Sequence, residues 1–263
     1  MTDQHSKIRS SDIIPLPAFR DNYIWLLRHG RSAAVVDPGD ADVVDDALQQ
    51  HGLQLDAILL THHHDDHIGG VAELAARHHP QVFGPAGEHI PAITRHVREG
   101  DEIVLEALDL RFTVLEIPGH TCTHVAYLAP GILFPGDTLF SAGCGRLFGG
   151  TPGQMHDSLQ RLAQLPGDTG VYCAHEYTLA NLVFSLAAEP DNALRDTWLA
   201  ECEALRRNDR PTLPSSIARE KQINPFLRTD VAGVIAAVTA HGGTRPAGPR
   251  ECFAALRAWK DVF

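Results

Sequence analysis

The sequence predicts an α/β protein in which two β-sheets pack on each other with helices outside, followed by a smaller α-helical domain. Short apolar segments with strand character alternate with helical segments, a second group of short strands follows, and the pattern after Glu176 is almost entirely helical. The 263 residues suffice for a sizeable core, as one large domain or two smaller ones. We therefore expect a mixed domain over residues 1–175 and a helical domain over residues 176–263.

Each expected strand is a short apolar or alternating segment bounded by turn residues. The first two strands lie between Ile13 and Leu27, with a turn at Asp21-Asn22. Further strands are expected at residues 32–37, 57–60, 81–83, 102–105, 110–116, 124–128, 131–134 and 170–176. Helical spacing predicts helices at 42–51 and 71–79, and then at 177–188, 191–207, 217–227, 231–241 and 249–263. One more helix could lie between residues 83 and 102.

Charge and composition restrict the classes of function. The formal net charge of −11 at pH 7 disfavours nucleic acid and anionic membranes as partners, because both select basic faces. No apolar run approaches the length of a bilayer span, and residues 1–11 lack the apolar region of a signal peptide. The five cysteines include no C-x-x-C pair, which argues against a disulfide framework. We expect a cytoplasmic monomer that acts on a small molecule.

The strongest chemical signal is the segment Thr61–Gly70, T-H-H-H-D-D-H-I-G-G. It directly follows the apolar residues 57–60 and so lies at the C-terminal end of an expected strand, where open α/β sheets bind their ligands. The simpler interpretation, a polar loop that happens to be rich in histidine, would suit a single histidine better than this cluster. Imidazole and carboxylate groups at this density indicate a metal site, with Zn²⁺ favoured and Fe²⁺ or Mn²⁺ as alternatives.

Alternation along the segment separates the expected ligands from their neighbours, because successive side chains of an extended chain point to opposite sides. The expected ligands are His62, His64, Asp66 and, where the loop begins to turn, His67. His63 and Asp65 fall on the other side, behind the ligands or in solvent. Four ligands exceed the three that an open catalytic zinc needs, which suggests two metal ions.

Three further ionisable residues follow expected strands elsewhere in the first domain. His120 comes after Ile117-Pro118-Gly119, Asp137 comes after Leu133–Gly136, and His175 ends the segment 170–175. A single histidine after a strand is more often structural, but together the three supply ligands at an edge that an α/β fold brings together. A closed structural zinc site is a weaker explanation, since such sites use four ligands and often cysteine, whereas this set has seven ligands and no cysteine.

These motifs resemble the metallo-β-lactamase superfamily. The residues that carry the resemblance are H-x-H-x-D-H at 62–67, Gly119-His120, Gly136-Asp137 and Ala174-His175-Glu176. Within the superfamily the chain is similar to the glyoxalase II family, the hydroxyacylglutathione hydrolases, over nearly its whole length. That similarity rests on P-A-F-R-D-N-Y-I-W-L-L at 17–27, G-D-T-L-F-S-A-G-C-G-R at 136–146, A-H-E-Y-T at 174–178 and I-N-P-F-L-R-T at 223–229.

The resemblance implies an αββα sandwich that holds two divalent metal ions and is the catalytic domain, followed by a helical substrate-binding domain. One ion would be bound by His62, His64 and His120, and the other by Asp66, His67 and His175. Asp137 would bridge the two ions. The implied contacts to glutathione are Arg146, Tyr177, Arg257 and Lys260. The chain departs from the family in having Arg146 where many members have Lys and Phe148 where several have Tyr.

The reaction that the resemblance implies is hydrolysis of S-(2-hydroxyacyl)glutathione thioesters, chiefly S-D-lactoylglutathione, to glutathione and D-lactate. A hydroxide shared by the two metal ions would attack the thioester carbonyl. Asp66 is the candidate catalytic proton acceptor, although a role as ligand alone is favoured. The alternative function is that of a glutathione persulfide dioxygenase of the same superfamily, an iron enzyme that uses fewer of these ligands and lacks the long helical tail.

On the helical interpretation of the C-terminus, Arg257 and Lys260 are neighbours on one face. Leu256, Trp259 and Phe263 form an adjacent apolar stripe that would dock this helix. Without the resemblance, a solvated basic face at a helix C-terminus would be the preferred interpretation. With it, the two cations are expected to bind the carboxylates of an anionic substrate that the net charge of the protein does not attract.

Overall fold

A computed structural model describes residues 12–87, 89–90 and 92–263, which form two compact units. The first unit comprises the described residues up to Glu116 together with Thr123–Gly136. The second comprises Ile117–Cys122 and Asp137–Phe263. Residues 137–175 thus group with the helical part of the chain. The interpretation of residues 1–11 lies outside the described residues.

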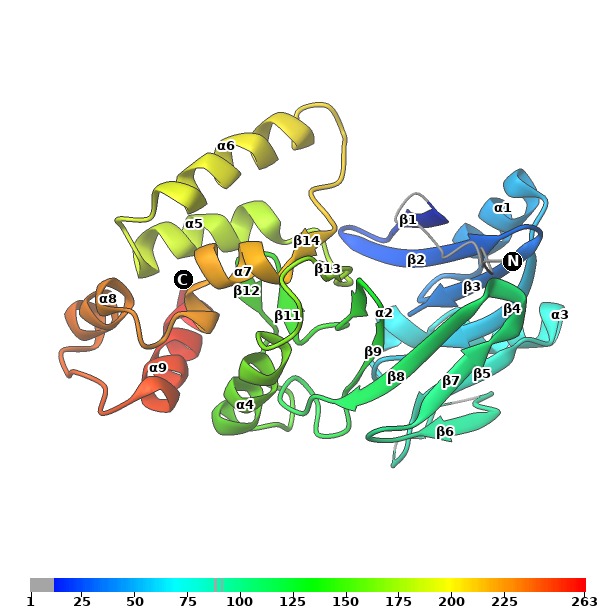
Figure 1. Cartoon of the computed structure of the whole chain (residues 1–263), viewed down its shortest axis with the longest axis horizontal. Helices are drawn as coiled ribbons and strands as arrows, with labels where there is room; N and C mark the ends of the chain where they lie inside the picture. Colours follow the sequence, from blue (N-terminus) through cyan, green and yellow to red (C-terminus); the bar gives the residue numbers. More distant parts are fainter. Residues whose placement is uncertain (1–11, 88, 91) are drawn as a thin grey trace, which may run out of the picture. The chain divides into compact units, whose positions relative to one another are not determined.

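The first sheet of the first unit has the strand order β1-β2-β3-β4-β5-β6 (Figure 1). The strands are β1 (Ile13–Ala18), β2 (Asn22–His29), β3 (Ser32–Val36), β4 (Gln54–Leu59), β5 (Gln81–Pro85) and β6 (Arg95–Val97). β1, β2 and β3 pair antiparallel, whereas β3 to β6 pair parallel. Residues 95–97 thus form an edge strand, where the sequence was compatible with a helix. The parallel pairing brings the C-terminal ends of β3 and β4 to the same edge.

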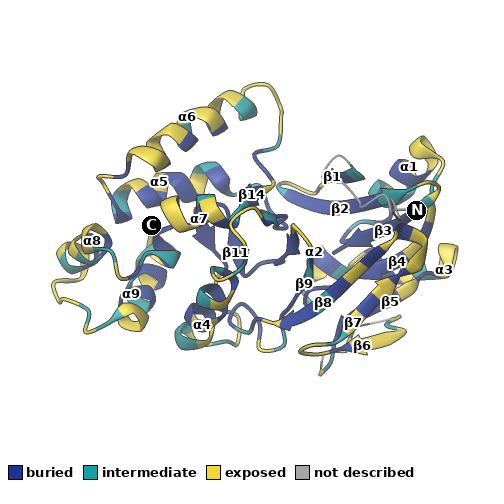
Figure 2. Cartoon of the chain, viewed as in Figure 1, coloured by how far each residue is buried: buried dark blue, intermediate teal, exposed yellow. Residues whose placement is uncertain are grey.

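Two crossover helices, α1 (Ala41–His51) and α3 (Val71–His78), cover one face of this sheet. Asp40 caps α1, because its side chain accepts hydrogen bonds from the backbone N–H groups of Asp42 and Val43. Buried side chains of both helices pack against alternate residues of β2 and β3, including Leu26 and Val35. Figure 2 shows β2 buried along most of its length, as expected for a strand covered on both faces.

The other face of β2 carries Trp25 and Leu27 and meets a second, antiparallel group of strands in the order β10-β9-β8-β7. These are β7 (Glu102–Leu105), β8 (Leu110–Glu116), β9 (Val125–Ala129) and β10 (Ile132–Phe134), with η2 (Glu106–Leu108) between β7 and β8. The Tyr127 hydroxyl on β9 donates a 2.6 Å hydrogen bond to the carbonyl of Leu60 just after β4. The predicted arrangement of two facing sheets with outer helices is confirmed.

The second unit contains two short strand pairs and most of the helices. The hairpin β11 (Leu139–Phe140)–β12 (Gly143–Cys144) and the pair β13 (Gly170–Val171)–β14 (Ser215–Ser216) are antiparallel. The helices are α4 (Pro152–Leu162), α5 (Thr178–Ala188), α6 (Ala193–Arg206), α7 (Ile217–Ile223), η3 (Pro225–Leu227), α8 (Ala232–Gly242) and α9 (Pro249–Val262). The expected C-terminal helices are present, and α4 is an additional one. Across the described residues, every helix is too short or too polar to cross a membrane.

A buried polar network fixes the β11–β12 hairpin within this unit. The fully buried Glu220 carboxylate accepts a 2.7 Å hydrogen bond from the backbone N–H of Ala142 at the hairpin turn. The Asn224 amide donates to that carboxylate and, at 2.9 Å, to the carbonyl of Gly143. Burial raises the pKa of Glu220, and the hydrogen bonds that its carboxylate accepts partly offset this rise. The network fixes the segment between Asp137 and Arg146, both of which are predicted site residues.

Candidate metal centre

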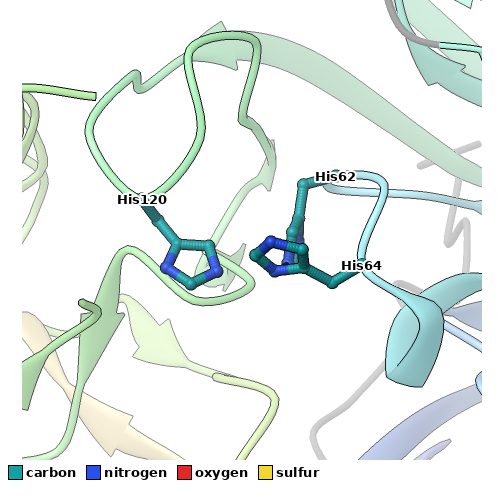
Figure 3. A group of neighbouring side chains, drawn as sticks. All are labelled: His62, His64 and His120. Atoms are coloured by element: carbon teal, nitrogen blue, oxygen red, sulfur yellow. Dashed lines mark hydrogen bonds between the residues drawn. The ribbon is translucent and has the colours of Figure 1, made fainter. Parts of the chain in front are cut away.

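The histidine-rich loop leaves the sheet at the C-terminal end of β4, as predicted. His62 and His64 lie in the irregular segment after the strand, and their imidazole rings are drawn in Figure 3. Asp66 and His67 then lie in α2 (Asp65–Ile68), a single helical turn. The turn brings Asp66 and His67 to the same region as the two preceding histidines, whereas Asp65 is exposed.

The nitrogens and oxygens of these four side chains converge. The distance from His62 Nε2 to His64 Nδ1 is 2.9 Å, and from His67 Nε2 to Asp66 Oδ2 it is 3.5 Å. His62 and His67 are fully buried, whereas 43% of the Asp66 side chain is exposed. Buried imidazole and carboxylate donors at such short separations suit a divalent cation, because each is a ligand type that zinc, iron and manganese accept.

Asp37, which follows β3, lies behind two of these histidines. Its carboxylate accepts hydrogen bonds from the backbone N–H and the hydroxyl of Thr61, at 2.8 and 2.7 Å, and its Oδ2 lies 3.1 Å from His67 Nδ1. The Thr61 oxygen is 3.0 Å from His62 Nδ1. Asp37, His62 and His67 also form a group whose ligand atoms lie within 4.8 Å. Because Asp37 faces the Nδ1 of His67, it leaves Nε2 for the metal, and we assign it an orienting role.

Asn22, at the start of β2, holds Asp66 in place. Its side-chain amide donates a 2.9 Å hydrogen bond to Asp66 Oδ2. This hydrogen bond restricts the Asp66 carboxylate and favours its role as a ligand over its role as a proton acceptor. Neither Asn22 nor Asp37 was singled out from the sequence. Asp37 could have been, since it is an ionisable residue at a strand end, which is the criterion that selected Asp137.

The second unit holds the other predicted ligands, His120, Asp137 and His175. The two oxygens of Asp137 face different histidines: Oδ2 is 3.5 Å from His120 Nε2, and Oδ1 is 3.3 Å from His175 Nε2. All three residues are buried. A carboxylate placed in this way can give one oxygen to each of two ions. His175 does not end a strand as expected, because β13 stops at Val171 and an irregular segment carries the chain onward.

Neighbouring residues fix the orientation of both histidines. His120 Nδ1 lies 2.7 Å from the carbonyl of Arg146, so that nitrogen carries the proton and Nε2 is left for a metal. The Phe148 ring, which is 54% exposed, meets the His120 ring edge-on at 5.4 Å. Tyr177 stacks on His175 with the ring centroids 4.6 Å apart. The structure therefore places Tyr177 and Phe148 beside proposed metal ligands.

The predicted cations lie around Asp261 in the second unit. Asp261 Oδ1 is 3.8 Å from Arg146 Nε and 2.9 Å from Arg257 Nη2. Lys260 donates a 3.3 Å hydrogen bond to the carbonyl of Ala180 at the start of α5. Burial lowers the pKa of Lys260, and the nearby positive charges of Arg257 and Arg146 lower it further. Three cations this close form a local positive region on a protein of net charge −11.

Arg257 does not lie on a solvated basic face, the interpretation that would be preferred without the family resemblance. It is only 3% exposed, and its guanidinium donates to the carbonyl of Cys144 at 2.9 Å and packs over the Phe226 ring. Its side chain therefore ties α9 to the β11–β12 hairpin. The expected apolar stripe docks α9: Leu256 is fully buried, and the Trp259 and Phe263 rings meet the Phe184 ring of α5 edge-on, with centroids 5.4 and 5.3 Å apart, although Phe263 is 58% exposed.

The fold and the ligand set together define the class of protein. A sequence model described as the metallo-beta-lactamase superfamily matches residues 18–175. A second model, described as the hydroxyacylglutathione hydrolase C-terminus, matches residues 176–263. The fold and the His/Asp cluster of this class support the binding of divalent metal ions.

Full-length relatives of the chain identify the family within this superfamily. Proteins named hydroxyacylglutathione hydrolase from Cupriavidus taiwanensis and Chromohalobacter salexigens are each 55% identical to the chain. The matches cover 95% of this chain and 98% and 99% of those proteins. The chain belongs to the hydroxyacylglutathione hydrolase family.

Solved structures agree with this fold at lower identity. The crystal structure of ETHE1 from Myxococcus xanthus has a TM-score of 0.61 and 28% identity, and the match covers 94% of this chain and 99% of that one. TTHA1623, crystallised in a di-iron-bound form, has a TM-score of 0.59 and 28% identity, and the match covers 81% of this chain and 100% of that one.

Proposed function

We propose that the protein hydrolyses S-(2-hydroxyacyl)glutathione thioesters, chiefly S-D-lactoylglutathione, to glutathione and the 2-hydroxy acid. Family membership over nearly the whole chain supports the substrate class. The observation that carries the chemistry is the Asp137 carboxylate, whose two oxygens face two different histidines. We also propose that residues 1–175 act as the catalytic domain and residues 176–263 as the substrate-binding domain of a cytoplasmic monomer.

The proposed site holds two divalent ions, with Zn²⁺ favoured and iron or manganese as alternatives. The proposed ligands of one ion are His62, His64 and His120 (Figure 3), and those of the other are Asp66, His67 and His175. Asp137 would bridge the two ions. When bound, the two ions activate a water molecule and polarise the thioester carbonyl. Asn22 and Asp37 keep Asp66 and His67 oriented, so these ligands lose little freedom when metal binds.

The substrate supplies the leaving group. Attack of the activated water on the thioester carbonyl breaks the C–S bond and releases glutathione thiolate. A thiol pKa of about 8.5 makes this thiolate a good leaving group, so a strong general acid is unnecessary. We propose that Arg146 and Lys260 bind the carboxylates of glutathione and that Tyr177 is a further contact to the substrate. Arg257 supports this region through its contacts to Cys144 and Asp261.

Replacing Lys260 with alanine is expected to raise KM for lactoylglutathione with little change in kcat. A lost charge-assisted contact remote from the thioester weakens ground-state and transition-state binding equally, by roughly 1–3 kcal/mol or about 5- to 150-fold. Steady-state kinetics measure the effect. The matched control is Lys221→Ala, which removes an exposed cation from α7 in the same unit. An unchanged KM in Lys260→Ala would exclude Lys260 from substrate binding. Arg257→Ala is a less clean test, since it also loosens the hairpin.

The proposed activity is tested by assaying lactoylglutathione cleavage under nitrogen with a parallel metal analysis. We expect thiol release at the same rate with and without oxygen, in protein containing two divalent ions per chain. The thioester hydrolysis consumes only water, which is why oxygen should have no effect. Turnover only with glutathione persulfide, accompanied by oxygen consumption, would instead assign the protein as a persulfide dioxygenase.

A further inference from the structure

Phe19, in the turn between β1 and β2, combines two unfavourable features. Its side chain is 60% exposed, and its backbone has a φ of 51°, in the left-handed region. A bulky residue in that region is a conformational outlier, for which asparagine or glycine would be ordinary choices. Strained positions of this kind cluster at functional sites, where another requirement fixes the residue.

The Phe19 ring lies next to the proposed metal ligand Asp66. A Cβ atom added to Gly39 would lie 2.7 Å from Cε2 of Phe19 and 2.0 Å from the backbone oxygen of Asp66. The aromatic ring and the Asp66 backbone therefore approach Gly39 from neighbouring positions, and only glycine leaves room for both. At the other end of the turn, Asn22 donates its 2.9 Å hydrogen bond to the Asp66 carboxylate. Both ends of the turn, Phe19 and Asn22, therefore lie close to Asp66.

Asp66 is an accessible proposed ligand, with 43% of its side chain exposed. A thioester carbonyl that reacts at this site must approach the metal ligands. Carbon 2 of the acyl group, which carries the variable substituent, is bonded directly to the reacting carbonyl carbon and must therefore lie close to the same ligands. An exposed aromatic ring beside Asp66 offers an apolar surface but no charge or hydrogen-bond donor. It therefore suits the hydrocarbon substituent of a 2-hydroxyacyl group better than the carboxylates of glutathione, which require cations.

We propose that Phe19 is a specificity-determining residue that packs against the 2-substituent of the acyl group and favours thioesters with larger apolar substituents. The inference rests on the proposed thioester hydrolysis. It explains why the chain keeps a bulky residue where the backbone conformation disfavours one: the ring is retained for contact with substrate, at the expense of local stability.

The test compares three glutathione thioesters that differ only in the 2-substituent: glycoloyl with hydrogen, lactoyl with methyl and mandeloyl with phenyl. The variants are Phe19→Ala, Phe19→Asn, which suits a positive φ, and Val104→Ala as control. Val104 is an exposed apolar residue on β7 in the same unit. Measurements are kcat/KM for each substrate, metal content per chain and Tm.

For both Phe19 variants we expect the mandeloyl-to-glycoloyl ratio of kcat/KM to fall about 10-fold, with metal content as in the wild type. Phe19→Asn should also have a Tm equal to or above that of the wild type, because the substitution relieves the strained backbone. Val104→Ala should change none of these quantities.

Three results would overturn the inference. An equal loss with all three substrates, accompanied by metal loss or a lower Tm, would show that Phe19 only supports Asp66. If the mandeloyl-to-glycoloyl ratio of kcat/KM were unchanged in both variants, the acyl group would not contact the Phe19 ring. Hydrolysis by the wild-type protein would in that case still support the proposed function. A wild-type protein that cleaves none of the three thioesters would remove the proposed function and this inference together.

Discussion

Asp137→Ala is expected to abolish most of the activity, by at least about 10³-fold, and to lower the metal content of the purified protein. One carboxylate faces both His120 Nε2 and His175 Nε2, so under the proposed assignment a single substitution removes a ligand from both ions. The charge stabilisation that a metal ion gives to a developing oxyanion amounts to several kcal/mol, which sets the scale of the loss. The fold should persist, because it depends on sheet and helix packing away from this side chain.

Metal analysis by mass spectrometry and kcat/KM on lactoylglutathione measure the two effects of this substitution. Circular dichroism verifies that the variant is folded. Asp168→Ala is the matched control, since it removes an exposed carboxylate from the same unit. A variant that keeps two ions and turns over at nearly the normal rate would rule out Asp137 as a bridging ligand.

Most of the proposed metal ligands were selected from the sequence because they belong to local patterns. The four residues of the H-x-H-x-D-H loop follow an apolar strand directly, and alternation alone separates His62 and His64 from His63. Asp137 follows β10 in the same way. These signals need only the chain within a few residues of the ligand. Two local features, the alternation of side chains along an extended segment and the position of the C-terminal end of a strand, are sufficient to select these candidate ligands.

The orienting residues could not be found in the same way, because their partners are distant in sequence. Asn22 contacts Asp66 across 44 positions, and Arg257 contacts Cys144 across 113. Nothing near Arg257 in the sequence shows that backbone carbonyls will accept its hydrogen bonds, so the residues alone favoured a solvated cation near the end of a helix. Burial of a long charged side chain depends on these tertiary partners.

Some secondary structure was missed although a local signal was present. α4 begins with Thr151 as its N-cap, Pro152 in its first turn and Gln154 completing a capping box. Such a capping box with proline in the first turn is a local signal for a helix start. The β11–β12 hairpin has only two residues in each strand, too few for alternation to indicate a strand. Its stability comes instead from the buried Glu220 and Asn224.

Asp37→Asn is expected to weaken metal binding about 10- to 100-fold while leaving the apo protein folded. Asparagine has the shape of aspartate and tolerates the positive φ of 53° at this position, so the backbone need not change. The substitution replaces one acceptor oxygen with an NH₂ group. An NH₂ group accepts no hydrogen bond, so the one remaining oxygen can serve either the Thr61 N–H or the Thr61 hydroxyl and His67 Nδ1, but not all three.

Competition with a chromophoric chelator measures zinc affinity in each variant, and Tm of the metal-free protein reports on folding. Thr61 supplies a matched pair of controls, because its hydroxyl connects Asp37 to His62 Nδ1. Thr61→Ser keeps the hydroxyl and should retain near-normal affinity, whereas the isosteric Thr61→Val should lose affinity as Asp37→Asn does. If Asp37 were itself a ligand, Asp37→Asn would weaken binding but Thr61→Val would not. Wild-type affinity in Asp37→Asn would show that the carboxylate neither binds the metal nor orients its ligands.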